Sequence, residues 1–225
     1  MKTTLLFSFG LLATITSASE IQPFEATYEI IRGGKTTGTL TTLLEKISDD
    51  RWTIKDTIVG TSGMASFIGF KRVEKTEFIY DDKVLLATHH EMNQKAAFSN
   101  KTYTFNWQPE SKQYQIQHKG QLTQYEPKNK QVISSQMMPL ALALAACQQN
   151  TKIELQVLKN KSVTPYQFNI SNNKTLIAER IYSNKTSKKT ESWLDPKRQC
   201  LPSKQSHQVK DNPTILTKLT SFKWL

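Results

Sequence analysis

The stretch Phe24-Glu-Ala-Thr-Tyr-Glu-Ile30 alternates apolar and polar side chains at every position. Successive residues of a β-strand point to opposite faces, so this alternation predicts a strand with one apolar face. Gly33 and Gly34 then predict a turn into a threonine-rich second strand over residues 36–44. The same period of two recurs through residues 52–118, with polar turns between the segments. The first half of the chain therefore predicts a meander of antiparallel strands.

The alternation breaks at residues 134–149, which read Ser-Ser-Gln-Met-Met-Pro-Leu-Ala-Leu-Ala-Leu-Ala-Ala-Cys-Gln-Gln. Alanine, leucine and methionine are strong helix formers, and serine is a favoured cap. Pro139 fits only the first turn of a helix, so the helix is expected to begin near Gln136 or Met137. It is apolar on nearly all sides, which favours burial. Strands resume after residue 150 and predict a second meander.

These elements predict a mainly β fold. We expect a strongly curved antiparallel sheet or incomplete β-barrel, with one long apolar helix packed against its concave side. A sandwich of two packed sheets is the alternative. No internal repeat, low-complexity tract or linker divides the chain. Residues 19–225 are therefore expected to form a single β-rich domain.

Residues 1–18 have the three parts of a secretory signal peptide. Lys2 gives a basic start, residues 5–15 form an apolar core, and Thr16-Ser-Ala18 offers a cleavage site. The apolar core is shorter than the ~20 residues that span a bilayer. A buried N-terminal strand or helix is the alternative. No second long apolar run follows, so the mature chain is expected to lack a transmembrane segment.

Cys147 and Cys200 are the two cysteines of the chain. In the oxidising compartment that a signal peptide implies, an even pair predicts one disulfide bond. Two unpaired buried thiols are the alternative, because two cysteines carry no spacing pattern that tests the pairing.

Positive charge is concentrated in the last third of the chain. Residues 1–150 contain 16 Lys and Arg against 14 Asp and Glu, whereas residues 151–225 contain 14 against 5. A solvated basic face explains this imbalance, and so does attraction to an anionic partner such as lipid headgroups or an acidic envelope polymer. Nucleic acid is not expected as a partner, because no recognition helix or RNA-binding motif accompanies the lysines.

The run Gly60-Thr-Ser-Gly-Met-Ala-Ser-Phe-Ile-Gly-Phe70 is uncharged and apolar, and it lies between two strands with polar faces. Its large side chains form the candidate site, a flexible lip at the mouth of a ligand cavity: Met64, Phe67, Ile68 and Phe70. The alternative is that these side chains fill the core beneath a tight loop.

The same run, followed by Arg72, Glu74 and Phe78, resembles the most recognisable stretch of a bacterial family, "domain of unknown function 3108". The opening at residues 23–30 and the segment 190–202 are similar to the start and the C-terminal hairpin of that family. The resemblance covers the mature chain. It implies an exported protein of Gram-negative bacteria, located in the periplasm, and it implies no established activity.

The sequence predicts no catalytic, cofactor-binding or metal-binding residues. Ser62 lacks the glycine two places on and the strand–turn–helix setting of a nucleophile elbow, so it is interpreted as a turn residue. His90 and Met92 share one face of a strand while His89 faces the other way, which leaves too few ligands for a copper site. No spacing pairs a carboxylate with a base. The sequence therefore favours a protein that is not an enzyme.

Three hypotheses for function follow. The leading one is a non-catalytic envelope protein that binds a hydrophobic or amphiphilic ligand, such as a lipid or another anionic amphiphile, in the hollow of its sheet. The second is an assembly factor that docks another envelope protein through the 60–70 loop. The third is a hydrolase of an envelope polymer, for which no residues are identified.

Overall fold

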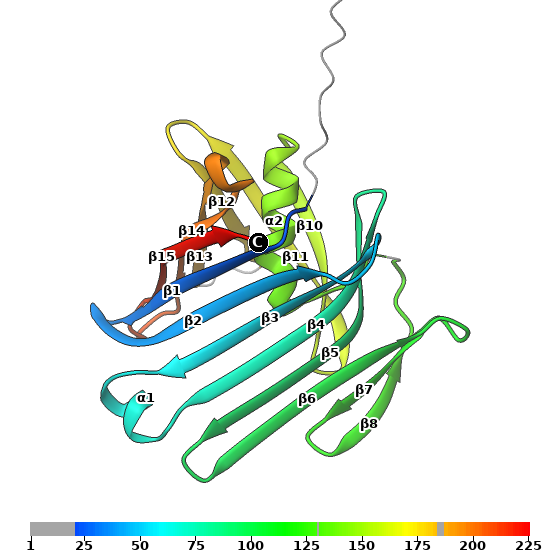
Figure 1. Ribbon diagram of the computed structural model, residues 1–225, viewed down its shortest axis with the longest axis horizontal. Helices are drawn as coiled ribbons and strands as arrows, with labels where there is room; N and C mark the ends of the chain where they lie inside the picture. Colours follow the sequence, from blue (N-terminus) through cyan, green and yellow to red (C-terminus); the bar gives the residue numbers. More distant parts are fainter. Residues whose placement is uncertain (1–20, 130, 184–186) are drawn as a thin grey trace, which may run out of the picture.

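Figure 1 shows a computed structural model of the protein, in which residues 21–129, 131–183 and 187–225 are described. The described strands form one sheet of fifteen, in the order β8-β7-β6-β5-β4-β3-β2-β1-β15-β14-β13-β12-β11-β10-β9. The prediction of a mainly β fold built on a strongly curved sheet is confirmed. The sandwich alternative is wrong, because these strands are not divided between two sheets. The predicted signal peptide over residues 1–18 lies outside the described residues.

The sheet consists of two meanders. The first contains β1 (Phe24–Arg32), β2 (Lys35–Lys46), β3 (Arg51–Gly60), β4 (Lys71–Asp81), β5 (Val84–Ala96), β6 (Ser99–Gln108), β7 (Gln113–His118) and β8 (Gln121–Tyr125). The second contains β10 (Lys152–Lys159), β11 (Ser162–Asn172), β12 (Leu176–Ile181), β13 (Lys189–Asp195), β14 (Leu201–Gln208) and β15 (Ile215–Trp224). The short β9 (Ile133–Ser134) lies parallel to β10.

Antiparallel pairing of β1 with β15 joins the two meanders. The ladder runs the whole length of β1, from Phe24 opposite Trp224 to Arg32 opposite Ile215. The first and last described strands are therefore neighbours, although they are far apart in the chain. Without this pairing, β1 and β15 would each be an exposed edge strand.

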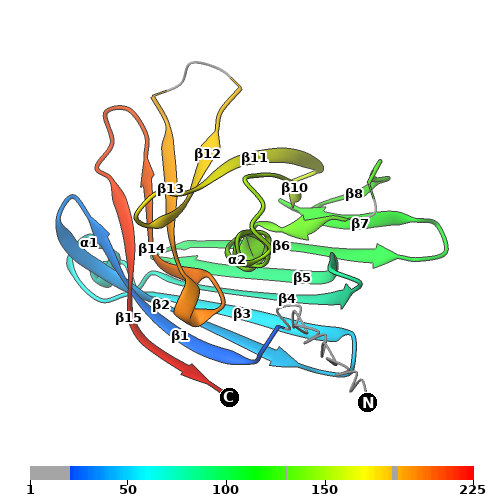
Figure 2. The ribbon, with the colours of Figure 1, turned by 90° about the horizontal axis from the view of Figure 1, so that it is seen from above.

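The concave side of the sheet encloses α2 (Met138–Cys147), which directly follows the 3₁₀ turn η1 (Ser135–Met137). Figure 2 looks along this helix and shows it inside the curl of the sheet. Leu140 and Leu142 are buried, as are the alanines between and after them, because the helix is surrounded by strands.

The expectation of one long helix is wrong. The α-helix has ten residues and the preceding 3₁₀ turn has three. Pro139 has no N–H to donate to the carbonyl four residues earlier, and Ser135 instead accepts from the N–H of Met138, which tightens the first turn. At the other end Gln149 has a left-handed backbone with φ of 61°, which stops the helix.

The two edge strands of the curled sheet, β8 and β9, do not pair with each other. Instead, the β9 end of the sheet lies against the first meander. The carbonyl group of Val132, just before β9, accepts a hydrogen bond of 2.8 Å from the N–H of Ala87 in β5. The β9 edge therefore lies against β5, a central strand of the first meander. Among the helices in the described part of the chain, none has both the length and the apolarity needed to cross a membrane.

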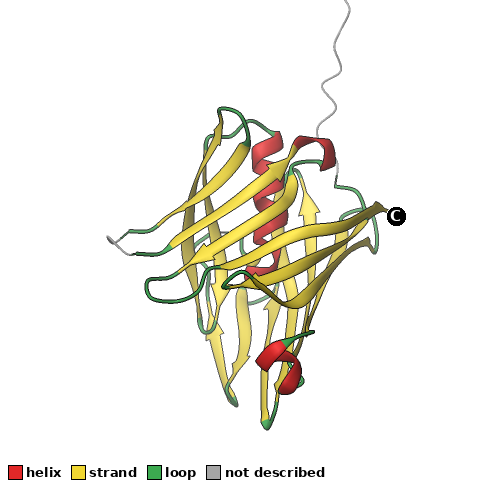
Figure 3. Cartoon of the chain, turned by 90° about the vertical axis from the view of Figure 1, so that its left-hand side faces the viewer, coloured by secondary structure: helices red, strands yellow, loops and turns green. Residues whose placement is uncertain are grey.

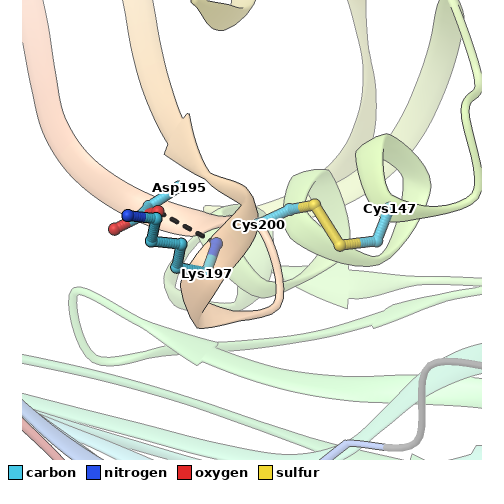
Figure 4. The surroundings of a disulfide bond; sticks show 4 residues. All are labelled: Cys147, Asp195, Lys197 and Cys200. Carbon is cyan, nitrogen blue, oxygen red and sulfur yellow. Dashed lines mark hydrogen bonds between the residues drawn. A yellow bond between two sulfur atoms is a disulfide. The ribbon is translucent and has the colours of Figure 1, made fainter.

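A disulfide bond joins Cys147, at the last turn of α2, to Cys200, just after the 3₁₀ turn η2 (Pro196–Arg198). Figure 4 shows the bond beside Asp195, whose carboxylate accepts a hydrogen bond of 3.0 Å from the N–H of Lys197. The structure thus brings together the two cysteines that the sequence analysis paired. The bond attaches the enclosed helix to the β13–β14 hairpin of the second meander.

Removing this bond is expected to destabilise the fold. The cysteines are 53 residues apart, and closing a loop of that length in the unfolded chain contributes about 2–4 kcal/mol to stability. The double variant Cys147→Ala/Cys200→Ala should therefore lose about that amount in the free energy of unfolding, measured in urea. Dithiothreitol should destabilise the parent and leave the variant unchanged. Equal stability of variant and oxidised parent would contradict the prediction.

Candidate ligand-binding cleft

The 60–70 loop contains a five-residue helix, α1 (Gly63–Phe67), at one end of the sheet. Figure 3 shows α1 at the lower ends of the strands, while α2 lies farther up inside the curl. Backbone hydrogen bonds fix the loop: Thr61 N–H donates to the carbonyl of Thr37 at 3.0 Å, and Phe70 N–H donates to that of Ala65 at 2.9 Å. The Ser62 hydroxyl also donates to the carbonyl of Thr36. This loop is folded, and Ser62 attaches it to β2.

Two glycines allow close packing at this end of the sheet: Gly60 lets α1 lie directly against β3, and Gly38 lets β2 approach β3 closely. Gly38 and Gly60 face each other across β2 and β3. A Cβ atom on Gly60 would lie 2.6 Å from the backbone of Ala65, and one on Gly38 would lie 2.5 Å from the carbonyl oxygen of Val59. Both contacts are closer than atoms tolerate. Gly60, the first residue of this run, therefore has a packing role that the sequence analysis did not identify.

An apolar cleft of about 320 Å³ lies under this loop, at the end of the curl. Its walls come from the end of β1, the start of β2, the end of β3, the start of β15, and the loop. Among the predicted site residues, Met64, Ile68 and Phe70 line the cleft, whereas Phe67 does not and is 87% exposed. The loop thus supplies one wall of the cleft and also presents a side chain to solvent.

Arg32 is the single charged residue in the lining of this cleft. It is exposed at the end of β1, and no ion pair involves it within the described part of the chain. Opposite it in the β1–β15 ladder is Ile215, which also lines the cleft. An apolar hollow with one guanidinium group is suited to a molecule that has an apolar body and an anionic head.

A polar layer lies deeper in the curl, between the cleft and α2, and we define it as Asp56, Glu74, Thr76, His90 and Gln136. Thr76 is its centre: the hydroxyl donates to the Gln136 side-chain oxygen at 2.8 Å and also bonds to His90 Nδ1 at 2.8 Å. The Gln136 amide donates at 3.2 Å to backbone carbonyl groups of β3 and β4. These bonds attach η1 to the inner face of the sheet.

Two carboxyl groups of this layer, Asp56 and Glu74, are directly opposite each other on β3 and β4. Burial, helped by the charge of Glu74, raises the pKa of Asp56 to about 7, although the Thr42 hydroxyl opposes the shift by donating to the carboxyl at 2.6 Å. Burial also raises the pKa of Glu74, and the ion pair with Arg72 acts against that rise.

The third titratable group of the polar layer is His90. Burial, with the nearby charge of Arg72, lowers the pKa of His90 to about 3, so the ring is neutral. His89 lies on the other side of β5 and bonds through Nδ1 to the side-chain oxygen of Asn106 at 2.7 Å. Within the described residues, no three His, Cys, Asp or Glu side chains are grouped as metal ligands.

The space beside the polar layer is small. A cavity of about 40 Å³, lined by Tyr28, Asp56 and Gln136 among others, adjoins it. A space of that size holds water molecules but no substrate. The hydrogen bonds of the polar layer therefore hold η1 and α2 in place, and the apolar cleft with Arg32 is the candidate site.

The fold class is that of a β-barrel-like curled sheet, and the comparisons with known proteins agree with this. The chain is similar to the crystal structure of a beta-barrel-like protein of domain of unknown function DUF1849 from Brucella abortus. The two chains are 10% identical, with a TM-score of 0.59, over 91% of this chain and 98% of the other. At that identity the similarity shows the fold alone. No family model matches the sequence, and no curated protein matches it.

Sequence reasoning missed the polar layer, although a signal for it exists. Asp56 occupies an inward-facing position between Ile54 and Ile58, and Glu74 and Thr76 likewise precede the buried Phe78 at steps of two. A polar residue at an inward-facing position of a strand has one of two explanations. Either it forms a hydrogen bond with another buried group, or the strand has been assigned the wrong inward face. The partner Gln136 lies in another element, so the sequence did not show the pairing.

The raised pKa of Asp56 has a measurable consequence for stability. Between the ordinary Asp pKa of 3.8 and about 7, only the folded state holds the proton, so rising pH lowers the free energy of unfolding through this group. Asp56→Asn removes this effect while keeping an acceptor for Thr42. The variant should be more stable than the parent by about 2–4 kcal/mol near pH 8, and the gain should vanish near pH 4.

The quantity to compare is the difference between variant and parent in urea unfolding at each pH. His90 changes stability in the opposite direction over part of this range, because its ring takes up a proton only on unfolding, but it contributes equally to both proteins. Glu110→Gln, which removes an exposed carboxylate, is the control. A variant that is less stable than the parent near pH 8 would show that the Asp56 carboxylate is stabilising.

Proposed function

We propose that this protein binds an anionic amphiphile in the cleft, without catalysing a reaction on it. The observation that carries the proposal is the combination of apolar walls with one unpaired guanidinium group, that of Arg32. The volume of about 320 Å³ is at the lower end of small-molecule sites, which measure roughly 300–1,000 Å³. An alkyl or acyl segment fits such a space, with a carboxylate or phosphate at the Arg32 side.

The location that we propose is the bacterial cell envelope, with the mature chain in the periplasm. The predicted signal peptide and the resemblance to domain of unknown function 3108 support this location. The disulfide between Cys147 and Cys200 supports it independently, because such bonds persist in oxidising compartments. Membership of that family and the removal of residues 1–18 are part of the same proposal.

The alternative of an assembly factor has one observation in its favour, the exposure of Phe67 on the loop. A protein partner that covers the loop would bury this side chain. The hydrolase hypothesis has no comparable support, because the cavity that Asp56 of the polar layer lines measures about 40 Å³ and is too small for a substrate.

The proposal is tested by titrating the chain from residue 19, which retains every described element, with a fluorescent fatty acid. Saturable binding to the parent is expected. Ile215→Glu should weaken it tenfold or more, about 1.4 kcal/mol, because the new carboxylate faces the cleft. Arg32→Gln should weaken it only a fewfold, since an exposed ion pair contributes about 0.2–1 kcal/mol.

Ile47→Glu is the matched control, because Ile47 is also exposed but lies outside the cleft, after β2. Its affinity should equal that of the parent. Two results would overturn the proposal: absence of fatty-acid binding by the parent, together with no lipid in native mass spectra, or equal losses in Ile215→Glu and Ile47→Glu.

A further inference from the structure

Three large apolar side chains project into solvent at the α1 end of the sheet: Met64, Phe67 and Phe98, which we call the apolar tip. Phe67 is 87% exposed and Phe98 is fully exposed. Phe98 belongs to the turn between β5 and β6, whereas the other two belong to α1. The tip thus unites two neighbouring connections of the sheet, at the lower end of the strands in Figure 1.

A backbone hydrogen bond connects the two parts of the tip. The N–H of Ala97 donates to the carbonyl oxygen of Ile68 at 2.6 Å, so the β5–β6 turn is tied to the 60–70 loop. Both segments have positions fixed by the fold. Water-exposed phenylalanines at such positions reduce solubility and contribute nothing to the core, so their presence indicates an interaction surface.

Exposed lysines flank the apolar tip. Lys71 begins β4, Lys95 lies near the end of β5, and Lys101 lies near the start of β6. None of these three takes part in an ion pair with a described residue. Lys71 and Lys95 are directly opposite each other in the ladder, an arrangement that like charges disfavour. An anionic partner would relieve this repulsion.

The charge of the turns also differs between the two ends of the first meander. The connections at the α1 end, residues 33–35, 60–71, 95–101 and 118–122, contain five lysines and no acidic residue. The connections at the opposite end, residues 46–51, 81–84 and 108–113, contain five acidic residues and four basic ones. Basic charge is thus placed where the apolar tip is.

We propose that the apolar tip docks on the surface of an anionic lipid bilayer. Phenylalanine and methionine side chains enter the boundary between headgroups and acyl chains, and the flanking lysines contact the anionic headgroups. A bilayer needs no surface of complementary shape, which suits three side chains that project into solvent. The inference builds on the proposed function: Met64 belongs both to the tip and to the cleft, so docking places the cleft beside the lipid that supplies its ligand.

The experiment is flotation of the chain from residue 19 with vesicles of phosphatidylcholine, with or without a one-third share of phosphatidylglycerol. Binding is expected only to the anionic vesicles, and it should weaken as salt is added. The triple variant Lys71→Gln/Lys95→Gln/Lys101→Gln should bind on the order of a hundredfold more weakly, because each lysine near an anionic surface contributes about fivefold. Lys83→Gln/Lys112→Gln/Lys128→Gln removes the same charge elsewhere and should bind within about fivefold of the parent.

The apolar contribution is tested with Phe67→Ser/Phe98→Ser, which should weaken vesicle binding about tenfold or more. The matched control is Ile47→Ser/Val84→Ser, two exposed apolar side chains outside the tip. Phe67 and Phe98 do not line the cleft, so their variant should keep fatty-acid binding in solution and an unchanged melting temperature. Ile215→Glu should show the reverse, with fatty-acid binding weakened tenfold or more and vesicle binding within about fivefold of the parent.

These variants separate the two proposals. Failure of vesicle binding with intact fatty-acid uptake overturns the docking inference alone, and the opposite result overturns the proposed function alone. Equal binding to neutral and anionic vesicles, or equal losses in the tip variants and their controls, would also overturn the docking inference. So would capture of an envelope protein that requires Phe67 and Phe98 while vesicles are not bound, since the surface would then serve a protein partner.

Discussion

The pairing of β1 with β15 is the constraint on which the rest of this structure depends. Each meander alone would end in a long unpaired edge beside the concave face, and the two halves would be separate sheets. Joined, they form one surface that curls far enough to surround α2. The cleft depends on the same ladder, because Arg32 and Ile215, which line it, are opposite each other at the end of that ladder.

Along the strands, the interior changes from an apolar core to the polar layer and then to the cleft. Strand β3 contributes residues to all three. Trp52 and Ile54 belong to the apolar core around α2, Asp56 belongs to the polar layer, and Ile58 and Gly60 reach the cleft. An apolar core alone would allow α2 to rotate or slide, since its surface is apolar on nearly all sides. The hydrogen bonds of Gln136 and the disulfide at Cys147 fix it at its two ends.

The parts of this fold that depend on neighbouring residues were predictable from the sequence. Alternation predicted most of the strands, including the last at residues 215–224, but not β8 or β9, and helix-forming residues after Ser134 predicted the enclosed helix. The 3₁₀ turn η1 at the start of the helix was not predictable, because Gln136 in that turn is held by hydrogen bonds to backbone carbonyl groups of β3 and β4, which are distant in the chain. The candidate site was predicted in part: Met64, Ile68 and Phe70 line the cleft, but Arg32 and Ile215 come together through a pairing between distant strands, which periodicity does not show.

The unequal charge of the two ends of the first meander gives this half of the sheet an electric dipole along its strands. In the field of a negatively charged surface such a body rotates before any contact is made, and it approaches with the α1 end leading. The turns of the first meander at the opposite end, with five acidic and four basic residues, are nearly neutral and give an inverted encounter no such attraction. The arrangement therefore affects how often a collision is productive, separately from how long a contact lasts once the side chains have met.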